Sequence, residues 1–197
     1  DHRQLSFSRG GNRLAAFGAD EDHCAVSSMF GDIHNEGRQA HYATFSENED
    51  ALLLVHPENK ILLFDAQPGH NALKATLVPG GPVIQAEFSP DGKSIVALIG
   101  GAQPKLVSYD TISHERRDFA PPSLPKVSWI GMRGDWLVCW STDKQAEAIS
   151  LSNPSQRQLL QSALEHPPFA LEASDQNVFV SALHRVRAGQ LWLYRWS

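Results

Sequence analysis

The residues of this chain best suited to bind a metal ion form a short acidic cluster. Asp20, Glu21, Asp22 and His23 follow one another, and clustered carboxylates can bind Ca²⁺ through their oxygen atoms. The cluster lacks the glycine and the distal bidentate glutamate of an EF-hand loop. We therefore interpret it as a solvated loop, and the sequence predicts no metal site here.

The nine histidines are scattered along the chain. They show neither the HExxH pattern nor the helical i, i+4 spacing of a zinc site. We interpret them as surface or hydrogen-bonded histidines and expect no cofactor. The spacing of the histidines in the sequence does not test one alternative, in which metal ligands from separate repeats converge on a common axis.

No pattern of an activated nucleophile is present. A Gly-x-Ser-x-Gly elbow and a glycine-rich phosphate loop are both missing. Cys139 lies within the apolar segment 136–140, where burial makes a thiol inert. The sequence therefore predicts no catalytic residue and favours a protein that is not an enzyme.

These residues are carried by a sequence that repeats about every 42 residues. In the best-defined repeat, Phe88-Ser89-Pro90-Asp91-Gly92 precedes an apolar run at 94–99. Related segments begin at Phe7, Phe45, Ile130 and Ala173, so the successive steps are 38, 43, 42 and 43 residues. Expected third strands end near Phe64, Tyr109, Leu151 and Tyr194, with steps of 45, 42 and 43 residues. Two sets of positions thus share one period.

A period of this length with several strands per unit is typical of a β-propeller. We expect an all-β fold of about five four-stranded blades in a single domain, residues 1–197. The repeats are predicted at residues 1–38, 39–79, 80–122, 123–165 and 166–197. Gln156 to Leu164 is the one helix-like window, which we interpret as an outer strand. Five repeats could close by themselves, but we favour a part of a larger propeller with six to eight blades.

The third repeat resembles those of WD40 and TolB-type propellers. The resemblance rests on the turn 88–92 and on Tyr109-Asp110 and Phe64-Asp65, which fall where WD40 repeats place Trp-Asp. Gly80-Gly81 occupies the place of the Gly-His pair of that family. The resemblance implies a degenerate propeller of this kind.

Composition narrows the classes of partner. The chain has 197 residues, 42% of them hydrophobic and 20% charged, as in ordinary globular proteins. A net charge of −5 argues against nucleic acid as the main partner. No apolar run is long enough to cross a bilayer. Cys24 and Cys139 lie in repeats that are not neighbours, so we expect free thiols. Free thiols favour a reducing compartment, the cytoplasm, with the periplasm as the alternative.

We expect a non-catalytic interaction or scaffold module that belongs to a larger polypeptide or complex. Its partner would be another protein or another domain of the same polypeptide, bound by the loops between second and third strands. The expected binding residues are Asp20, Asp22, His23, His56, Glu58, Asp143, Lys144, His184, Arg185 and Arg187. The alternatives are an enzyme-associated propeller, such as a lactonase-like hydrolase or a peptidase gate, and a sensor domain of a signalling or transcriptional regulator.

Overall fold

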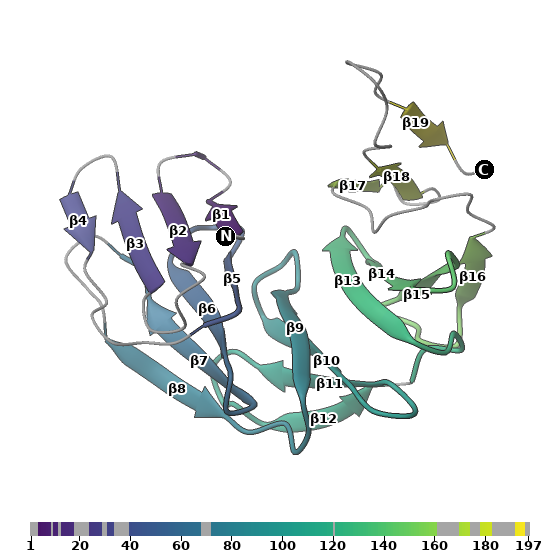
Figure 1. Ribbon diagram of the computed structural model, residues 1–197, viewed down its shortest axis with the longest axis horizontal. Coiled ribbons are helices and arrows are strands. Elements are labelled where there is room, and N and C mark those ends of the chain that lie inside the picture. The colour runs from purple at the N-terminus through teal and green to yellow at the C-terminus, as the bar shows by residue number, and fades with distance from the viewer. Residues whose placement is uncertain are drawn as a thin grey trace. The chain divides into compact units, whose positions relative to one another are not determined.

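The computed structural model describes residues 4–8, 10–11, 13–17, 24–28, 31–33, 40–67, 72–119, 121–160, 170–173, 178–182 and 192–195 (Figure 1). In these residues, all regular structure is β-strand. The chain divides into two compact units, one of residues 1–99 and 107–117 and the other of residues 100–106 and 118–197. The predicted all-β class is thus confirmed.

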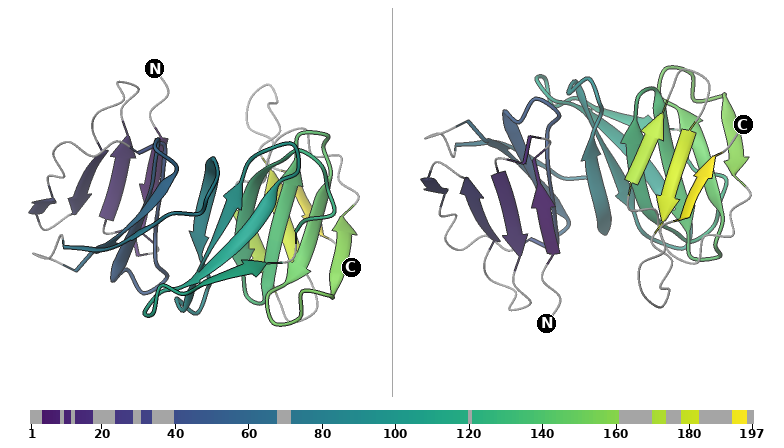
Figure 2. Two further views of the ribbon diagram at one scale, coloured as in Figure 1. Left: turned by 90° about the horizontal axis from the view of Figure 1, so that it is seen from below. Right: turned by 90° about the horizontal axis from the view of Figure 1, so that it is seen from above.

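The first unit holds three antiparallel sheets, each built from four strands that follow one another in sequence. The four strands of sheet 1 lie side by side in sequence order (Figure 2). Sheet 1 contains β1 (Gln4–Phe7), β2 (Arg13–Phe17), β3 (Cys24–Ser28) and β4 (Gly31–Ile33). Sheet 2 contains β5 (Tyr42–Phe45), β6 (Ala51–His56), β7 (Lys60–Asp65) and β8 (Leu73–Leu77). Sheet 3 contains β9 (Val83–Phe88), β10 (Ser94–Ile99), β11 (Lys105–Asp110) and β12 (Arg116–Phe119), and a few of its residues are assigned to the second unit.

The second unit holds the two remaining sheets of the described residues. Sheet 4 contains β13 (Val127–Arg133), β14 (Trp136–Ser141), β15 (Ala146–Ser150) and β16 (Arg157–Leu160). Sheet 5 contains β17 (Ala170–Ala173), β18 (Val178–Ala182) and β19 (Trp192–Arg195). The helix-like window therefore begins as the predicted outer strand, β16. No sheet of the described chain closes into a barrel, and each falls within one of the predicted repeats.

Strands at the middle of the sheets are apolar on both faces because both faces are covered. Five of the six residues of β6, from Ala51 to Val55, are buried. Their side chains alternate between two cores, since Leu52 and Leu54 pack with Ala15 of sheet 1, whereas Leu53 and Val55 pack with strands of sheet 3. This explains the continuous apolar runs, which are the pattern of a strand packed between two sheets.

A serine organises the turn between the first and second strands of each sheet in the first unit. In each turn, the backbone N–H three residues after the serine donates to the serine carbonyl, and the amide that begins the next strand donates to Oγ. The serines are Ser8, Ser46 and Ser89, all buried, with Oγ distances of 3.2, 2.9 and 2.9 Å to the amides of Arg13, Ala51 and Ser94. The third residue after the serine has positive φ at Gly11, Glu49 and Gly92. The repeated sequence pattern is thus a repeated turn.

Replacing Gly92 with alanine is expected to destabilise the protein by about 1 kcal/mol, through backbone strain alone. Gly92 has a φ of +70°, and a Cβ placed there would meet nothing within 4 Å. Gly92→Asn is the matched control, because asparagine tolerates this conformation better than alanine. Urea denaturation would measure both variants, and an equal loss of stability in the two would contradict the role assigned to φ.

A second repeated hydrogen bond ties the end of the third strand back to the turn before the second strand. Ala66 N donates to Asp50 O at 2.9 Å in sheet 2, and Thr111 N donates to Lys93 O at 3.0 Å in sheet 3. In sheet 4, Leu151 N donates to Asp135 O at 2.7 Å. Sheets 2, 3 and 4 therefore share this backbone hydrogen bond, which we call the closure of the sheet, although their sequences differ.

Candidate functional site

The turn between β6 and β7 presents a rigid group of exposed polar side chains. Asn59 N donates to His56 O at 3.0 Å, and Asn59 adopts a φ of +61°. The backbone N–H of Glu58 donates to His56 Nδ1 at 3.1 Å. Pro57, Glu58 and Asn59 are exposed, directly beyond the buried residues of β6. The sheet therefore fixes the backbone of the turn while its side chains face solvent.

The turn between β14 and β15 has the same construction in the second unit. Lys144 N donates to Ser141 O at 2.9 Å, and Lys144 has a φ of +64°. Asp143 N donates to Ser141 Oγ at 3.2 Å. Residues 142–145 are all exposed, whereas every residue of β14 is buried. Two unrelated sequences thus build one kind of charged hairpin tip.

Local ion pairs orient the charges of these tips. Lys60 Nζ lies 2.6 Å from Glu58 Oε2, and this contact lowers the pKa of Glu58 from its ordinary value. Lys126 Nζ lies 3.2 Å from Asp143 Oδ1. Exposed pairs of this kind contribute little to stability. Their carboxylates and ammonium groups can therefore exchange partners at small cost when another protein approaches.

Four of the expected binding residues lie at these tips. His56 and Glu58 are brought together in the first unit, and Asp143 and Lys144 are neighbours in the second. The other six, Asp20, Asp22, His23, His184, Arg185 and Arg187, lie outside the described residues. In sheet 3, the corresponding loop between β10 and β11, residues 100–104, is exposed at 101–103.

A polar network between the first strands of sheets 2 and 3 was not predicted from the sequence. The Tyr42 hydroxyl donates to Glu87 Oε1, and Gln85 Nε2 donates to the same oxygen at 2.8 Å. Gln85 Nε2 also lies 3.1 Å from the Tyr42 oxygen, and His41 Nε2 lies 3.1 Å from Val83 O. Tyr42 and Glu87 are 45 positions apart in the chain. The sequence held one indication of this network, since Gln85 and Glu87 are two residues apart in one strand and therefore share a face.

Partial burial affects the acid–base properties of this network, in which Gln85 is buried and Tyr42 and Glu87 are half-buried. Removal from water raises the pKa of the Glu87 carboxyl, against the lowering effect of hydrogen bonds from Tyr42, Gln85 and Thr44. Burial also raises the pKa of Tyr42 well above its ordinary value, and the charge of Glu87 adds to this. The pair therefore resists carrying two negative charges. No pattern of a catalytic acid pointed to Glu87 in the sequence.

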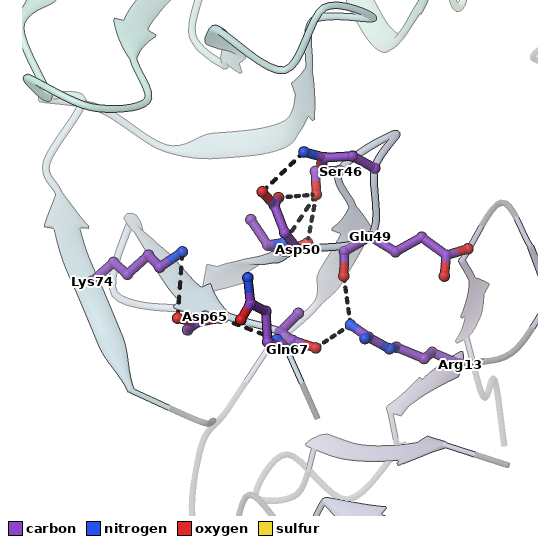
Figure 3. Close-up of polar contacts among 10 residues, drawn as sticks. Arg13, Ser46, Glu49, Asp50, Asp65, Gln67 and Lys74 are labelled. Carbon is purple, nitrogen blue, oxygen red and sulfur yellow. Dashed lines mark hydrogen bonds and ion pairs between the residues drawn. The ribbon is translucent and has the colours of Figure 1, made fainter. Parts of the chain in front are cut away.

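Arg13 joins sheets 1 and 2 through backbone atoms. Figure 3 shows its guanidinium group between the turn of Glu49 and the segment that follows β7, where Nη1 donates to the carbonyl oxygens of Glu49 and Ala66. Gly10 N also donates to the Glu49 carboxylate. Nearby, Asp65 accepts from Gln67 N at 3.0 Å and pairs with Lys74 Nζ at 3.6 Å. The contacts of Arg13 and Gly10 therefore join the two sheets, whereas those of Asp65 lie within sheet 2.

Two further features of the described residues bear on the sequence predictions, the cysteine at position 139 and the placement of potential metal ligands. Cys139 is a free thiol in a fully buried strand, as predicted, and burial together with the Glu147 carboxylate raises its pKa. Within this part of the chain, no group of three or more His, Cys, Asp or Glu side chains could hold a metal ion. A search of the same residues finds no helix with the length and apolar character to span a bilayer.

Comparison with known proteins gives no family assignment. The chain matches no protein-family model, and no curated protein matches its sequence.

Proposed function

We propose that the chain is a β-propeller of the WD40 or TolB type, or part of a larger one, and that it binds another protein or another domain of its polypeptide. Its successive sheets act as blades, and the hairpin tips between second and third strands form the binding surface. Four-stranded antiparallel meanders, repeated in sequence order, support the blade assignment.

This proposal rests mainly on the difference in burial between the second strands and the turns that follow them. In β6 and β14, nearly every residue is buried, whereas the residues that directly follow are exposed and include the charged Glu58, Asp143 and Lys144. A rigid scaffold with variable polar tips is a common means of recognition. The tips carry both signs of charge, at Glu58 and Lys60 and at Asp143 and Lys144. Such mixed charge suits a polar protein surface more than a phosphate backbone.

Site-specific photo-crosslinking in cells that express the full-length protein would test this surface. A benzophenone amino acid would replace Glu58 or Asp143, one at a time. The matched controls are Asn48 and Ser152, which are also exposed but lie in turns at the opposite ends of sheets 2 and 4. We expect Glu58 and Asp143 each to crosslink to a partner protein or domain, and the controls not to do so.

Charge reversal provides the second arm of the same experiment. Glu58→Lys, with the benzophenone amino acid at the neighbouring exposed Pro57, is expected to reduce the crosslink from this tip, because partner affinity falls. Asn48→Lys serves as its control. Crosslinks that form equally from all four positions, or from the control positions alone, would refute the proposed surface.

A further inference from the structure

Glu87 is an ionisable residue between two sheets, and the proposed binding surface does not explain its presence there. Its carboxyl group lies where β9 of sheet 3 meets β5 of sheet 2, and its hydrogen-bond donors come from both strands. Tyr42 reaches it from β5, and Gln85 reaches it from β9 itself. The network therefore joins two sheets through one ionisable group.

The groups acting on the Glu87 carboxyl are neutral. They are the hydroxyls of Tyr42 and Thr44 and the amide of Gln85, and no cation of the described residues is among them. Hydrogen bonds from neutral donors replace only part of the hydration that an ionised carboxylate loses on burial.

The strands packed against β9 supply no counter-ion either. Across the ladder from Glu87, β10 places Val96, and β6 and β7 contribute apolar side chains such as Leu53 and Leu63 to the adjoining core. The titratable groups at the ends of those two strands have other partners. His56 accepts from Glu58 N, Lys60 pairs with Glu58, and Asp65 pairs with Lys74. His41, just before β5, contacts the Val83 carbonyl instead.

We propose that Glu87 is a proton-linked join between sheets 2 and 3, which is tight while the carboxyl is protonated and weakens when it ionises. The protonated form needs no counter-ion, and its second oxygen still accepts hydrogen bonds. Ionisation places between the two first strands a negative charge that no cation of the described residues pairs. Tyr42 cannot relieve it by losing its own proton, because a second negative charge would follow. The join makes the first unit responsive to pH.

The direction of the effect follows from proton linkage. Because the pKa of Glu87 is higher in the folded than in the unfolded protein, the folded state holds this proton more tightly. Stability from this group is therefore present below the ordinary glutamate pKa and is lost as pH rises through the raised value. The test is to follow the melting temperature from about pH 5 to about pH 8 for the wild-type protein and for Glu87→Gln. The glutamine keeps an acceptor oxygen but cannot ionise.

We expect the wild-type melting temperature to fall relative to that of Glu87→Gln as pH rises. Glu58→Gln is the matched control, because it removes the same charge from an exposed site whose pKa is lowered, so it keeps the wild-type fall. Parallel pH profiles for the wild-type protein and Glu87→Gln would overturn the proposal.

Tyr42→Phe provides an independent variant in case Glu87→Gln does not fold. This variant removes a hydroxyl that stabilises the ionised carboxyl, so the pKa of Glu87 should rise further. Its melting temperature should therefore be lower than that of the wild-type protein, and the fall with pH should extend to higher pH. Hydrogen exchange of β5 and β9 amides gives a local measurement in the wild-type protein. After correction for the intrinsic pH dependence of exchange, their protection should fall with rising pH more than that of β14. Unchanged relative protection would contradict the join.

Discussion

Replacing Leu53 with alanine is expected to lower the free energy of unfolding by about 3 kcal/mol, within the range of ~2–5 kcal/mol for buried leucines. Leu53 is completely buried in the core between sheets 2 and 3, where it packs with Ile61, Ile95 and Ala97. Truncation removes apolar contacts and leaves a cavity that rigid strands on both sides cannot fill. Urea denaturation followed by circular dichroism would measure the loss.

The same substitution in the second unit tests whether the two units unfold together. Leu137 is also completely buried, opposite Ile149 in sheet 4. If residues 1–197 form one cooperative domain, Leu53→Ala and Leu137→Ala should shift a single transition by similar amounts. Two transitions, each shifted by only one variant, would instead assign separate stabilities to the units. Leu73→Ala is the control, since Leu73 is 48% exposed and its truncation should cost less than 1 kcal/mol.

Replacing Glu147 with alanine is expected to destabilise the second unit by about 2–3 kcal/mol. The Glu147 side chain is 3% exposed, and its carboxylate accepts from Ser123 N at 2.7 Å and lies 3.5 Å from Arg157 Nη1. Alanine leaves the Ser123 amide without this partner and weakens the attachment of segment 121–123 to β15. Breaking a fully buried pair costs ~3–5 kcal/mol, but the Arg157 side chain is 27% exposed and retains contact with water.

Glu147→Gln separates the hydrogen bond from the charge. Glutamine can still accept from Ser123 N through its amide oxygen, so it should recover part of the stability lost by alanine. Arg157 keeps its hydrogen bonds to the carbonyls of Pro154 and Pro121 in either variant. Equal stabilities of Glu147→Ala and the wild-type protein in urea denaturation would show that the carboxylate contributes nothing to the unit.

The sequence allowed the strands and turns to be predicted because each depends on local chemistry. The apolar run 94–99 is strand β10, and the third strands expected to end near Phe64 and Tyr109 are β7 and β11, which end one residue later. Gly92 marked its turn because few other residues adopt its φ. The number of blades and their closure remain predictions, since repeat spacing does not determine how many units complete a ring.

The candidate sites differ in how far sequence could reveal them. His56, Glu58, Asp143 and Lys144 were predicted because a polar segment between two apolar runs forms an exposed hairpin tip. The Tyr42–Gln85–Glu87 network was missed because Tyr42 comes from one repeat and Gln85 and Glu87 come from the next. The pKa values of Tyr42 and Glu87 are raised only when the two sheets meet. Glu147 was missed for a related reason, since its carboxylate is matched by Ser123 and Arg157 from outside its own strand.

The closure of sheets 2, 3 and 4, in which the end of the third strand bonds back to the first turn, has a consequence for how the chain folds. In sheet 2, the bond from Ala66 to Asp50 spans only 16 positions, and every strand pairs with its neighbour in sequence. Such contacts have low contact order, so the entropy lost in closing each loop is small. During synthesis, each sheet can therefore form soon after its last strand leaves the ribosome, before the next sheet has been made.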